Sequence, residues 1–230
     1  MGAPAASEGG GGHMSERDRE REAAVAETGG LGPVAPVDID VLREEIEKTY
    51  SDVTTKPEEE FIFPTGRAWA EDLGYPPELA NVPDASVESF AGVANHWVLG
   101  DVSEGQVALD LGCGAGTDLL IAAQKVGPSG RAIGIDMTPS MVERARQSAE
   151  EMGLGNAELH EGLIEQIPLP DESIDVVISN GVIDLVPDKD AVFSEIDRVL
   201  RPGGRLQIAD VVIHKEVSED ARQRIDLWTG

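Results

Sequence analysis

The sequence predicts a doubly wound α/β fold, in which helices cover both faces of a mostly parallel sheet. Two observations lead to this prediction. The apolar run at residues 107–111 is followed by a glycine-rich turn and a second apolar segment at 119–126, which is the pattern of a buried strand, a tight turn and a helix. From Gln106 onward, strand-like and helix-like segments alternate, and such alternation produces right-handed βαβ units and a parallel sheet.

The later helices have clear signals of their own. Thr138-Pro139 is an N-cap followed by proline at the first helical position, and Met141 and Ala145 begin a buried stripe at helical spacing. Val192 begins a similar stripe in the last helix. The expected strands cover residues 106–111, 131–136, 157–161, 174–179 and 205–212. The expected helices cover residues 117–126, 139–152 and 189–200.

Composition divides the chain into three regions. Residues 1–37 are rich in glycine and poor in large apolar side chains, so we predict a disordered tail. Residues 38–100 are expected to form an N-terminal helical cap, because they begin with an amphipathic helical pattern and hold much of the chain's aromatic content. Residues 101–230 are expected to form the α/β core.

The chain is strongly acidic, with 44 aspartates and glutamates against 18 lysines and arginines and a net charge of −26. Such a surface repels nucleic acid phosphates and anionic membranes, so we expect neither among the partners. An excess of acidic residues over lysine is also typical of a salt-adapted surface.

The single cysteine, Cys113, excludes an intramolecular disulfide and a cysteine-cluster metal site. No metal is expected. The chain has no apolar run approaching the roughly 18 residues of a membrane span. It also lacks the pattern of a signal peptide, so the expected location is the cytoplasm.

The spacing of the glycines separates two classes of cofactor. A dinucleotide-binding turn has the pattern G-x-G-x-x-G, but this turn has glycines at Gly112, Gly114 and Gly116, and Thr117 stands where the pattern needs the third glycine. Asp110 precedes the turn. A carboxylate there repels a pyrophosphate and suits a ligand with an ammonium group, so the spacing disfavours an NAD-dependent oxidoreductase.

Two more polar residues end strands of the predicted sheet. Asp136 ends the second strand, where an acidic residue can accept hydrogen bonds from both hydroxyls of an adenosine ribose. The alternative is a solvated or helix-capping aspartate. Asn180 follows the fourth strand, at the carboxyl edge where ligands bind in open α/β sheets.

Four motifs occur in order and at compatible spacing: D-L-G-C-G-A-G, G-I-D-M, I-S-N-G and L-R-P-G-G-R-L. Together they resemble class I S-adenosylmethionine (SAM) methyltransferases, which have a Rossmann-like sheet. The resemblance implies SAM as the cofactor and transfer of its methyl group as the reaction.

A narrower likeness rests on the segments F-x-F-P-T-G-R-A, S-F-A-G-V-A-N and V-I-S-N-G-V-I-D-L-V-P-D-K. They are similar to arsenite methyltransferases and their relatives of unassigned substrate, over roughly residues 50–230. This likeness implies that the glycine turn holds the methionine end of SAM and that Asp136 holds the ribose. The cofactor-binding residues that it implies are Tyr50, Asn95, Asp110, Gly112, Cys113, Gly114, Gly116, Asp136, Met137, Ile164, Glu165 and Asn180.

The chain departs from the arsenite methyltransferases at the substrate. These enzymes bind As(III) through cysteine thiolates, the ligands that a soft metalloid requires. Val93 and Gly181 stand at two of the cysteine positions, and Cys113 belongs to the SAM turn. We therefore expect the cofactor half of the site without the family's arsenic half.

The sequence thus predicts a SAM-dependent methyltransferase with an unidentified, small-molecule acceptor. One alternative is a protein that binds SAM or S-adenosylhomocysteine (SAH) without catalysis, and a less favoured one is an arsenite methyltransferase. The catalytic residues are unknown. Asp184, His96 and His214 are candidate bases by type, and His96 is the first to test because it adjoins Asn95 in the expected cap.

The C-terminal part carries a further expectation. Methyltransferases of this class usually end with a helix and an antiparallel strand pair, which are not recognisable after residue 212. If the chain ends at Gly230, the fifth strand is left as an open edge. We then expect self-association through that edge, or lower stability than a longer chain has.

Overall fold

The computed structural model describes residues 38–55, 61, 63–214, 218, 224 and 228. The tail predicted for residues 1–37 lies outside these residues. Five strands form a parallel sheet in the order β3-β2-β1-β4-β5. The strands are β1 (Val107–Leu111), β2 (Arg131–Asp136), β3 (Ala157–Glu161), β4 (Ile174–Asn180) and β5 (Leu200–Ala209). The Rossmann-like α/β fold is therefore confirmed.

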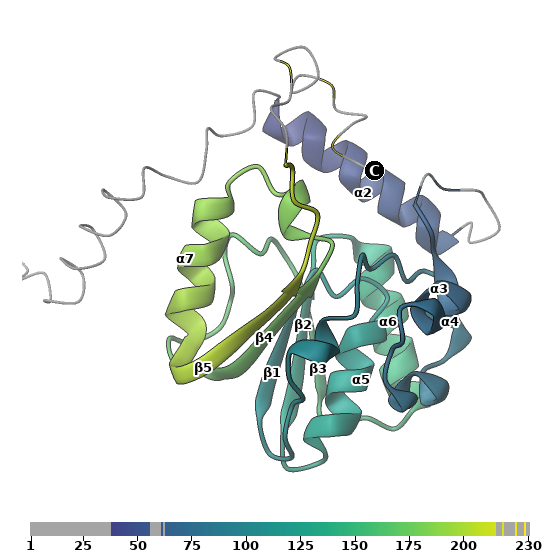
Figure 1. Cartoon of the computed structure of the whole chain (residues 1–230), viewed down its shortest axis with the longest axis vertical. Helices are drawn as coiled ribbons and strands as arrows, with labels where there is room; N and C mark the ends of the chain where they lie inside the picture. The colour runs from purple at the N-terminus through teal and green to yellow at the C-terminus, as the bar shows by residue number, and fades with distance from the viewer. Residues whose placement is uncertain are drawn as a thin grey trace, which may run out of the picture. The chain divides into compact units, whose positions relative to one another are not determined.

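Helices cover both faces of this sheet (Figure 1). Alternate residues of the strands point to opposite faces, so Ala108 and Ile178 belong to the core beside α5, whereas Leu109 and Val177 belong to the core beside α7. The helices of the core are α5 (Thr117–Val126), α6 (Pro139–Glu151), the short 3-10 helix η3 (Ile183–Leu185) and α7 (Lys189–Val199).

The described residues before β1 form one long helix and several short ones, which pack on α5, α6 and the last two strands. They are α2 (Ile39–Thr55), α3 (Gly66–Asp72), η1 (Pro77–Asn81), α4 (Asp84–Val87) and η2 (His96–Leu99). Two hydrogen bonds join the residues that follow η2 to the last strand. The Gln207 side chain donates to the Gly100 carbonyl over 2.8 Å, and Arg205 donates to the Asp101 carbonyl.

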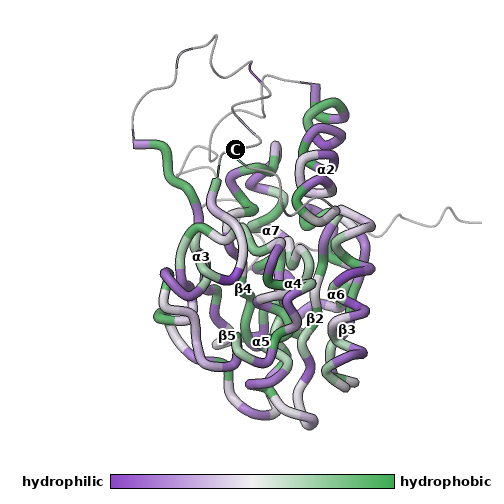
Figure 2. The backbone as a smooth tube through the Cα atoms, turned by 90° about the vertical axis from the view of Figure 1, so that its right-hand side faces the viewer, coloured by the Kyte–Doolittle hydropathy of each residue, from purple (hydrophilic) through white to green (hydrophobic). Residues whose placement is uncertain are grey.

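Helix α2 crosses one end of the sheet and packs on α6 (Figure 1). Hydrophobic and hydrophilic residues alternate along its turns (Figure 2). Val53 is fully buried against Ala115 and Met141, and the hydroxyls of Ser51 and Ser140 lie 3.3 Å apart. One face of α2 is thus fixed over the turn after β1.

The first four strands and the three long core helices match the sequence prediction to within a residue. The prediction for the fifth strand is wrong at both ends, since β5 spans Leu200–Ala209. At its start, Ile174 pairs with Leu200 and Val176 with Arg205, so the extra residues form an irregularity within the strand. At its end, the Asp210 carboxylate accepts from the backbone N–H groups of Ile183 and Val211, which turns the chain out of the sheet.

Among the described residues, we find no helix with the length and apolar character that crossing a membrane requires.

Candidate active site

The turn between β1 and α5 contains glycines with positive φ angles. Gly112 has φ +66°, and a Cβ there would lie 2.4 Å from Val182 Cγ2, so a larger residue is both strained and obstructed. Gly116 has φ +94°, and a Cβ there would lie 2.9 Å from the Cβ of Ala145 on α6. Gly112 therefore lets the turn approach the β4–α7 connection, while Gly116 lets α5 approach α6.

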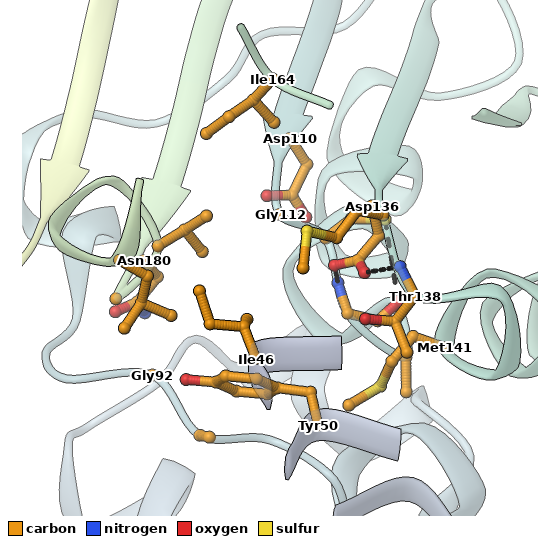
Figure 3. A pocket seen from close by; sticks show the side chains of 18 of the residues that line it. Ile46, Tyr50, Gly92, Asp110, Gly112, Asp136, Thr138, Met141, Ile164 and Asn180 are labelled. Carbon is orange, nitrogen blue, oxygen red and sulfur yellow. Dashed lines mark hydrogen bonds between the residues drawn. The ribbon is translucent and has the colours of Figure 1, made fainter. Parts of the chain in front are cut away.

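A cavity opens at the carboxyl ends of β1, β2 and β4, beside this turn (Figure 3). The strand arrows in Figure 3 point into it, and α2 crosses its far side with Ile46 and Tyr50 facing inward. Ten of the residues predicted to bind the cofactor line the cavity: Tyr50, Asp110, Gly112, Cys113, Gly114, Asp136, Met137, Ile164, Glu165 and Asn180. Asn95, Gly116 and His96 are not part of its lining.

Asp110 has a carboxylate oxygen with no partner. The side chain is only 4% exposed, and the Leu119 backbone N–H donates to it, but Oδ2 is buried without a hydrogen bond. Burial, and then the nearby Asp118 and Asp136 carboxylates, raise the pKa of Asp110 well above its usual value. A buried unpaired carboxylate is costly, so this cavity suits a ligand that brings a cation or a hydrogen-bond donor.

Asp136 is held in place by the two turns beside it. Its Oδ2 accepts from the Gly114 N–H over 2.9 Å, and its Oδ1 accepts from the Thr138 N–H over 2.8 Å (Figure 3). Burial raises the pKa of Asp136, although these hydrogen bonds oppose the rise. Each carboxylate oxygen has a second lone pair, so the group can also accept hydrogen bonds from two ligand hydroxyls.

Arg43 and Glu165 form an ion pair in the lining of the cavity. Arg43 on α2 donates from an Nη to Glu165 Oε1 over 2.9 Å, and both residues line the cavity with Met137 and Ile164. Because Arg43 lies on α2 and Glu165 follows β3, this pair links the N-terminal cap to the core.

Asn180 lines the opposite side of the cavity from Asp136 and Met141 (Figure 3). Its Oδ1 accepts from the Val93 N–H over 2.8 Å, and its Nδ2 donates to Tyr75 Oη over 2.7 Å and to the Ala94 carbonyl over 2.9 Å. The Asn180 amide thus holds the 92–94 segment against β4, and its polar atoms are occupied by the protein.

The network continues to a buried carboxylate, Asp118. Tyr75 Oη donates to Asp118 Oδ2 over 3.0 Å, and Trp97 Nε1 donates to Oδ1 over 2.8 Å. His96 is 1% exposed, with its Nε2 3.1 Å from Asp118 Oδ1. Burial opposes ionisation, but His96 and these donors outweigh it and lower the pKa of Asp118. His96 thus lies behind the cavity wall, next to Asp118.

Asn95 has a local role in the cap. Its Oδ1 accepts from the Trp97 N–H over 3.0 Å, at the start of η2, and its Nδ2 donates to the Gly74 carbonyl over 2.6 Å. Both polar atoms therefore connect two segments of the cap.

Ser89 is a candidate that the sequence analysis missed. It lines the cavity and is 5% exposed, and its hydroxyl is buried without a partner. In the sequence Ser89 is one serine of an irregular segment, and no spacing marks it as different from Ser86. Ser86 is bonded within the protein, since its hydroxyl donates to the Ala115 carbonyl and lies 2.8 Å from Ser148 Oγ.

The two positions where arsenite methyltransferases are expected to have cysteines face each other. A Cβ added at Gly181 would lie 3.1 Å from Val93 Cγ1. Gly181 also borders the part of the lining that has mostly apolar side chains, which we call the apolar end. It comprises Phe90, Ala91, Gly92, Gly181, Val182, Leu185, Val186 and Pro187. We call the opposite part, with Asp110, Gly112, Gly114 and Asp136, the carboxylate end.

A carboxyl pair lies beside the apolar end. Burial, and then a hydrogen bond and the charge of Asp210, raise the pKa of Asp184 to about 7. Neither side chain lines the cavity. Lys189 is close, and donates to the backbone carbonyls of Asp184 and Val186 over 2.9 Å each.

Comparison with known proteins finds similar methyltransferases. Residues 102–229 match the family model described as a methyltransferase domain. An arsenite methyltransferase from Halobacterium salinarum is 42% identical over 167 residues, which are 72% of this chain and 42% of that protein. A nocamycin O-methyltransferase from Saccharothrix syringae is 39% identical over 136 residues, which are 58% of this chain and 49% of that protein.

Among solved structures, an arsenic(III) S-adenosylmethionine methyltransferase from Chlamydomonas reinhardtii is similar, with a TM-score of 0.56 and 38% identity. The match covers 64% of this chain and 52% of that one. The chain spans about half or less of the length of these relatives.

Proposed function

Since this chain belongs to the family of class I methyltransferases that use S-adenosylmethionine, we propose that it transfers the methyl group of SAM to a small-molecule acceptor. The observation that carries the proposal is the unpartnered Asp110 carboxylate, which faces the same cavity as Asp136 and the glycine turn. A ligand with an ammonium group and a ribose satisfies both aspartates at once.

We assign each part of SAM to nearby lining residues. Asp136 accepts from the ribose hydroxyls, and Asp110 accepts from the ammonium group. Ser89 has a free buried hydroxyl, which donates to the cofactor's carboxylate in this proposal. The remaining cofactor-binding residues are Tyr50, Gly112, Cys113, Gly114, Met137, Ile164, Glu165 and Asn180, all of which line the cavity.

SAM supplies a methyl group on a positively charged sulfur, which is already strongly electrophilic. The residues of the chain therefore contribute mainly position and the exclusion of water. Ile46 and Tyr50 of α2 cover the cavity from the side opposite the strand ends, so α2 is suited to exclude water. The Asn180 amide fixes the 92–94 segment beside the acceptor.

Arsenite is the acceptor in the names of several relatives, but the residues here do not favour it. As(III) needs thiolate ligands, whereas Val93 and Gly181 carry no thiol, and a Cβ added at Gly181 would lie 3.1 Å from Val93 Cγ1. We expect no methylarsenicals above a control without enzyme, with or without added glutathione. Their appearance at a catalytic rate would contradict this assignment.

Calorimetry with SAM and SAH tests the cofactor assignment. Asp136→Ala should weaken binding by about 1–3 kcal/mol, because it leaves the ribose hydroxyls without an acceptor. Glu151→Ala removes the same charge from the exposed end of α6 and should leave the affinity unchanged. Equal affinities for all three proteins would refute the role of Asp136. Tighter binding of NAD than of SAM would refute the cofactor itself.

Turnover separates the enzyme from a protein that only binds SAM or SAH. Production of SAH in the presence of an acceptor panel supports the enzyme, and SAM binding without turnover across the panel supports the binding protein.

The division into a cap at 38–100 and a core at 101–230, and the cytoplasmic location, are further parts of the proposal. Limited proteolysis with mass spectrometry tests the boundary near residue 100.

A further inference from the structure

The apolar end has almost no polar side chain to offer a ligand. Phe90 and Ala91 approach from one segment, and Val182, Leu185 and Val186 approach from the β4–α7 connection. Asn180, the nearest amide, has its Oδ1 and Nδ2 engaged with Val93, Ala94 and Tyr75. A polar acceptor group would lose its hydration here without gaining a side-chain partner, which is costly.

The charges of the lining also select against anions. Arg43 has the only cationic side chain in the described lining. One of its Nη atoms donates to Glu165 over 2.9 Å, while its Nε is buried without a partner. The other charged lining residues are Asp110, Asp118 and Asp136. An acceptor with a carboxylate or phosphate would therefore meet four acidic side chains and one arginine that is already paired with Glu165, whereas recognition of such groups normally uses unpaired arginine or lysine.

Resting on the proposed function, we propose that the acceptor is an uncharged, largely apolar organic molecule that packs against the apolar end and presents one nucleophilic heteroatom to the cofactor. The heteroatom uses a lone pair to form its bond to the methyl carbon. The bond between that carbon and sulfur breaks with its electron pair retained by sulfur. The proton of the heteroatom passes to water, so the products are the methylated acceptor, SAH and a proton.

Leu185 offers a way to reverse the selectivity. It lines the apolar end and is half-buried, so a lysine at this position can place a cation in the wall and keep its stem on apolar surface. Leu99 is 61% exposed and lies outside the lining. Leu99→Lys therefore adds the same charge to the protein without changing the cavity.

The test uses the 230-residue chain saturated with SAH and measures binding of matched probes by calorimetry. The probes are 2-naphthol, which is uncharged, and 6-hydroxy-2-naphthoate, which adds a carboxylate to the same ring system. We expect 2-naphthol to bind at least about tenfold more tightly, in line with the loss from an unpaired buried charge. Leu185→Lys should remove or reverse this preference, and Leu99→Lys should keep it.

A milder variant gives a second measurement if Leu185→Lys does not fold. Val186→Thr keeps the shape and adds a hydroxyl to a residue that is 8% exposed, so it should weaken 2-naphthol binding about threefold to tenfold. Equal or tighter binding of the carboxylated probe to the unmodified chain would overturn the inference. So would SAH binding without binding of either probe. Failure to bind SAH at all would instead refute the proposed function, so the two failures are distinguishable.

Discussion

Compared with the apolar end of the cavity, the carboxylate end depends on single polar atoms. Asp136 is fixed by two backbone N–H groups, and Asp110 keeps one oxygen unpaired. At the apolar end, the side chains of Val182, Leu185 and Val186 contribute apolar area and have no group that can form a hydrogen bond. Affinity at the carboxylate end should therefore change sharply with one atom, whereas affinity at the apolar end should change gradually with size.

The two ends meet at Gly112, so Gly112→Ala should have the largest effect on both. The φ angle of +66° is unfavourable for alanine, and the new Cβ would lie 2.4 Å from Val182. We expect a loss of about 3 kcal/mol in the free energy of unfolding from strain and overpacking together, with loss of SAH binding. Thermal unfolding and calorimetry measure the two effects.

Gly153→Ala is the matched control, because Gly153 has φ +67° and no atom within 4 Å of an added Cβ. Gly153→Ala should lower the free energy of unfolding only by the cost of backbone strain, about 1 kcal/mol. Trimming the partner in Gly112→Ala/Val182→Ala should recover part of the lost stability. If Gly112→Ala is no less stable than Gly153→Ala, Gly112 and Val182 do not pack as closely as described.

Asp184, which lies beside the apolar end, should make the stability of the chain depend on pH. The folded carboxyl keeps its proton up to a pKa of about 7, above the ordinary value of 3.8, so the folded state binds more protons than the unfolded state between these values. Stability from this group therefore falls as the pH rises from about 4 to 7. Asp184→Asn should remove that fall and stabilise the chain at pH 8 by roughly 1–2 kcal/mol, after allowance for partial exposure.

The matching measurement at pH 4 should show little difference between Asp184→Asn and the unmodified chain. Melting temperatures across pH 4–8 give the whole curve. Parallel curves for the two proteins would mean that Asp184 ionises in the folded state as readily as in the unfolded one.

Ser89→Ala should have the smallest effect. We expect it to lower cofactor affinity without lowering stability. Removing a buried hydroxyl without a partner should leave stability unchanged or raise it by up to about 1 kcal/mol. Cofactor affinity should fall about fivefold to tenfold, because one hydrogen-bond donor to the cofactor's carboxylate is lost.

The control is Ser148→Ala, which removes the partner of Ser86. It should lower stability and leave cofactor affinity unchanged. Unaltered SAH affinity in Ser89→Ala would refute the proposed hydrogen bond from Ser89 to the carboxylate of the cofactor.

Periodicity and strand ends account for what the sequence could predict. The buried strands and amphipathic core helices have regular patterns, and the carboxyl ends of parallel strands meet at one edge of the sheet. For this reason Asp110, Asp136 and Asn180 reach one cavity. The end of β5 was not predictable in this way, because it depends on the hydrogen bonds of Asp210 to Ile183 and Val211.

The cap residues show why the remaining part of the site could not be predicted. Asn95 and His96 lie in a segment without periodicity, and their positions depend on contacts with Gly74 and Asp118. Ser89 becomes a candidate only because its hydroxyl has no partner in the folded chain. Whether a hydroxyl lacks a hydrogen-bond partner depends on every residue around it in the folded chain, so no local sequence pattern can indicate it.

The hydrogen bonds from Gln207 and Arg205 to the segment that follows η2 also bear on the order of folding. The Gln207 side chain is 1% exposed and donates to the carbonyls of His96 and Gly100, so more than a hundred residues separate the two partners along the chain. Contacts between such distant segments form slowly. During synthesis, the residues around η2 leave the ribosome long before their partner strand exists. The segment around η2 can therefore reach its folded position only after β5 has emerged.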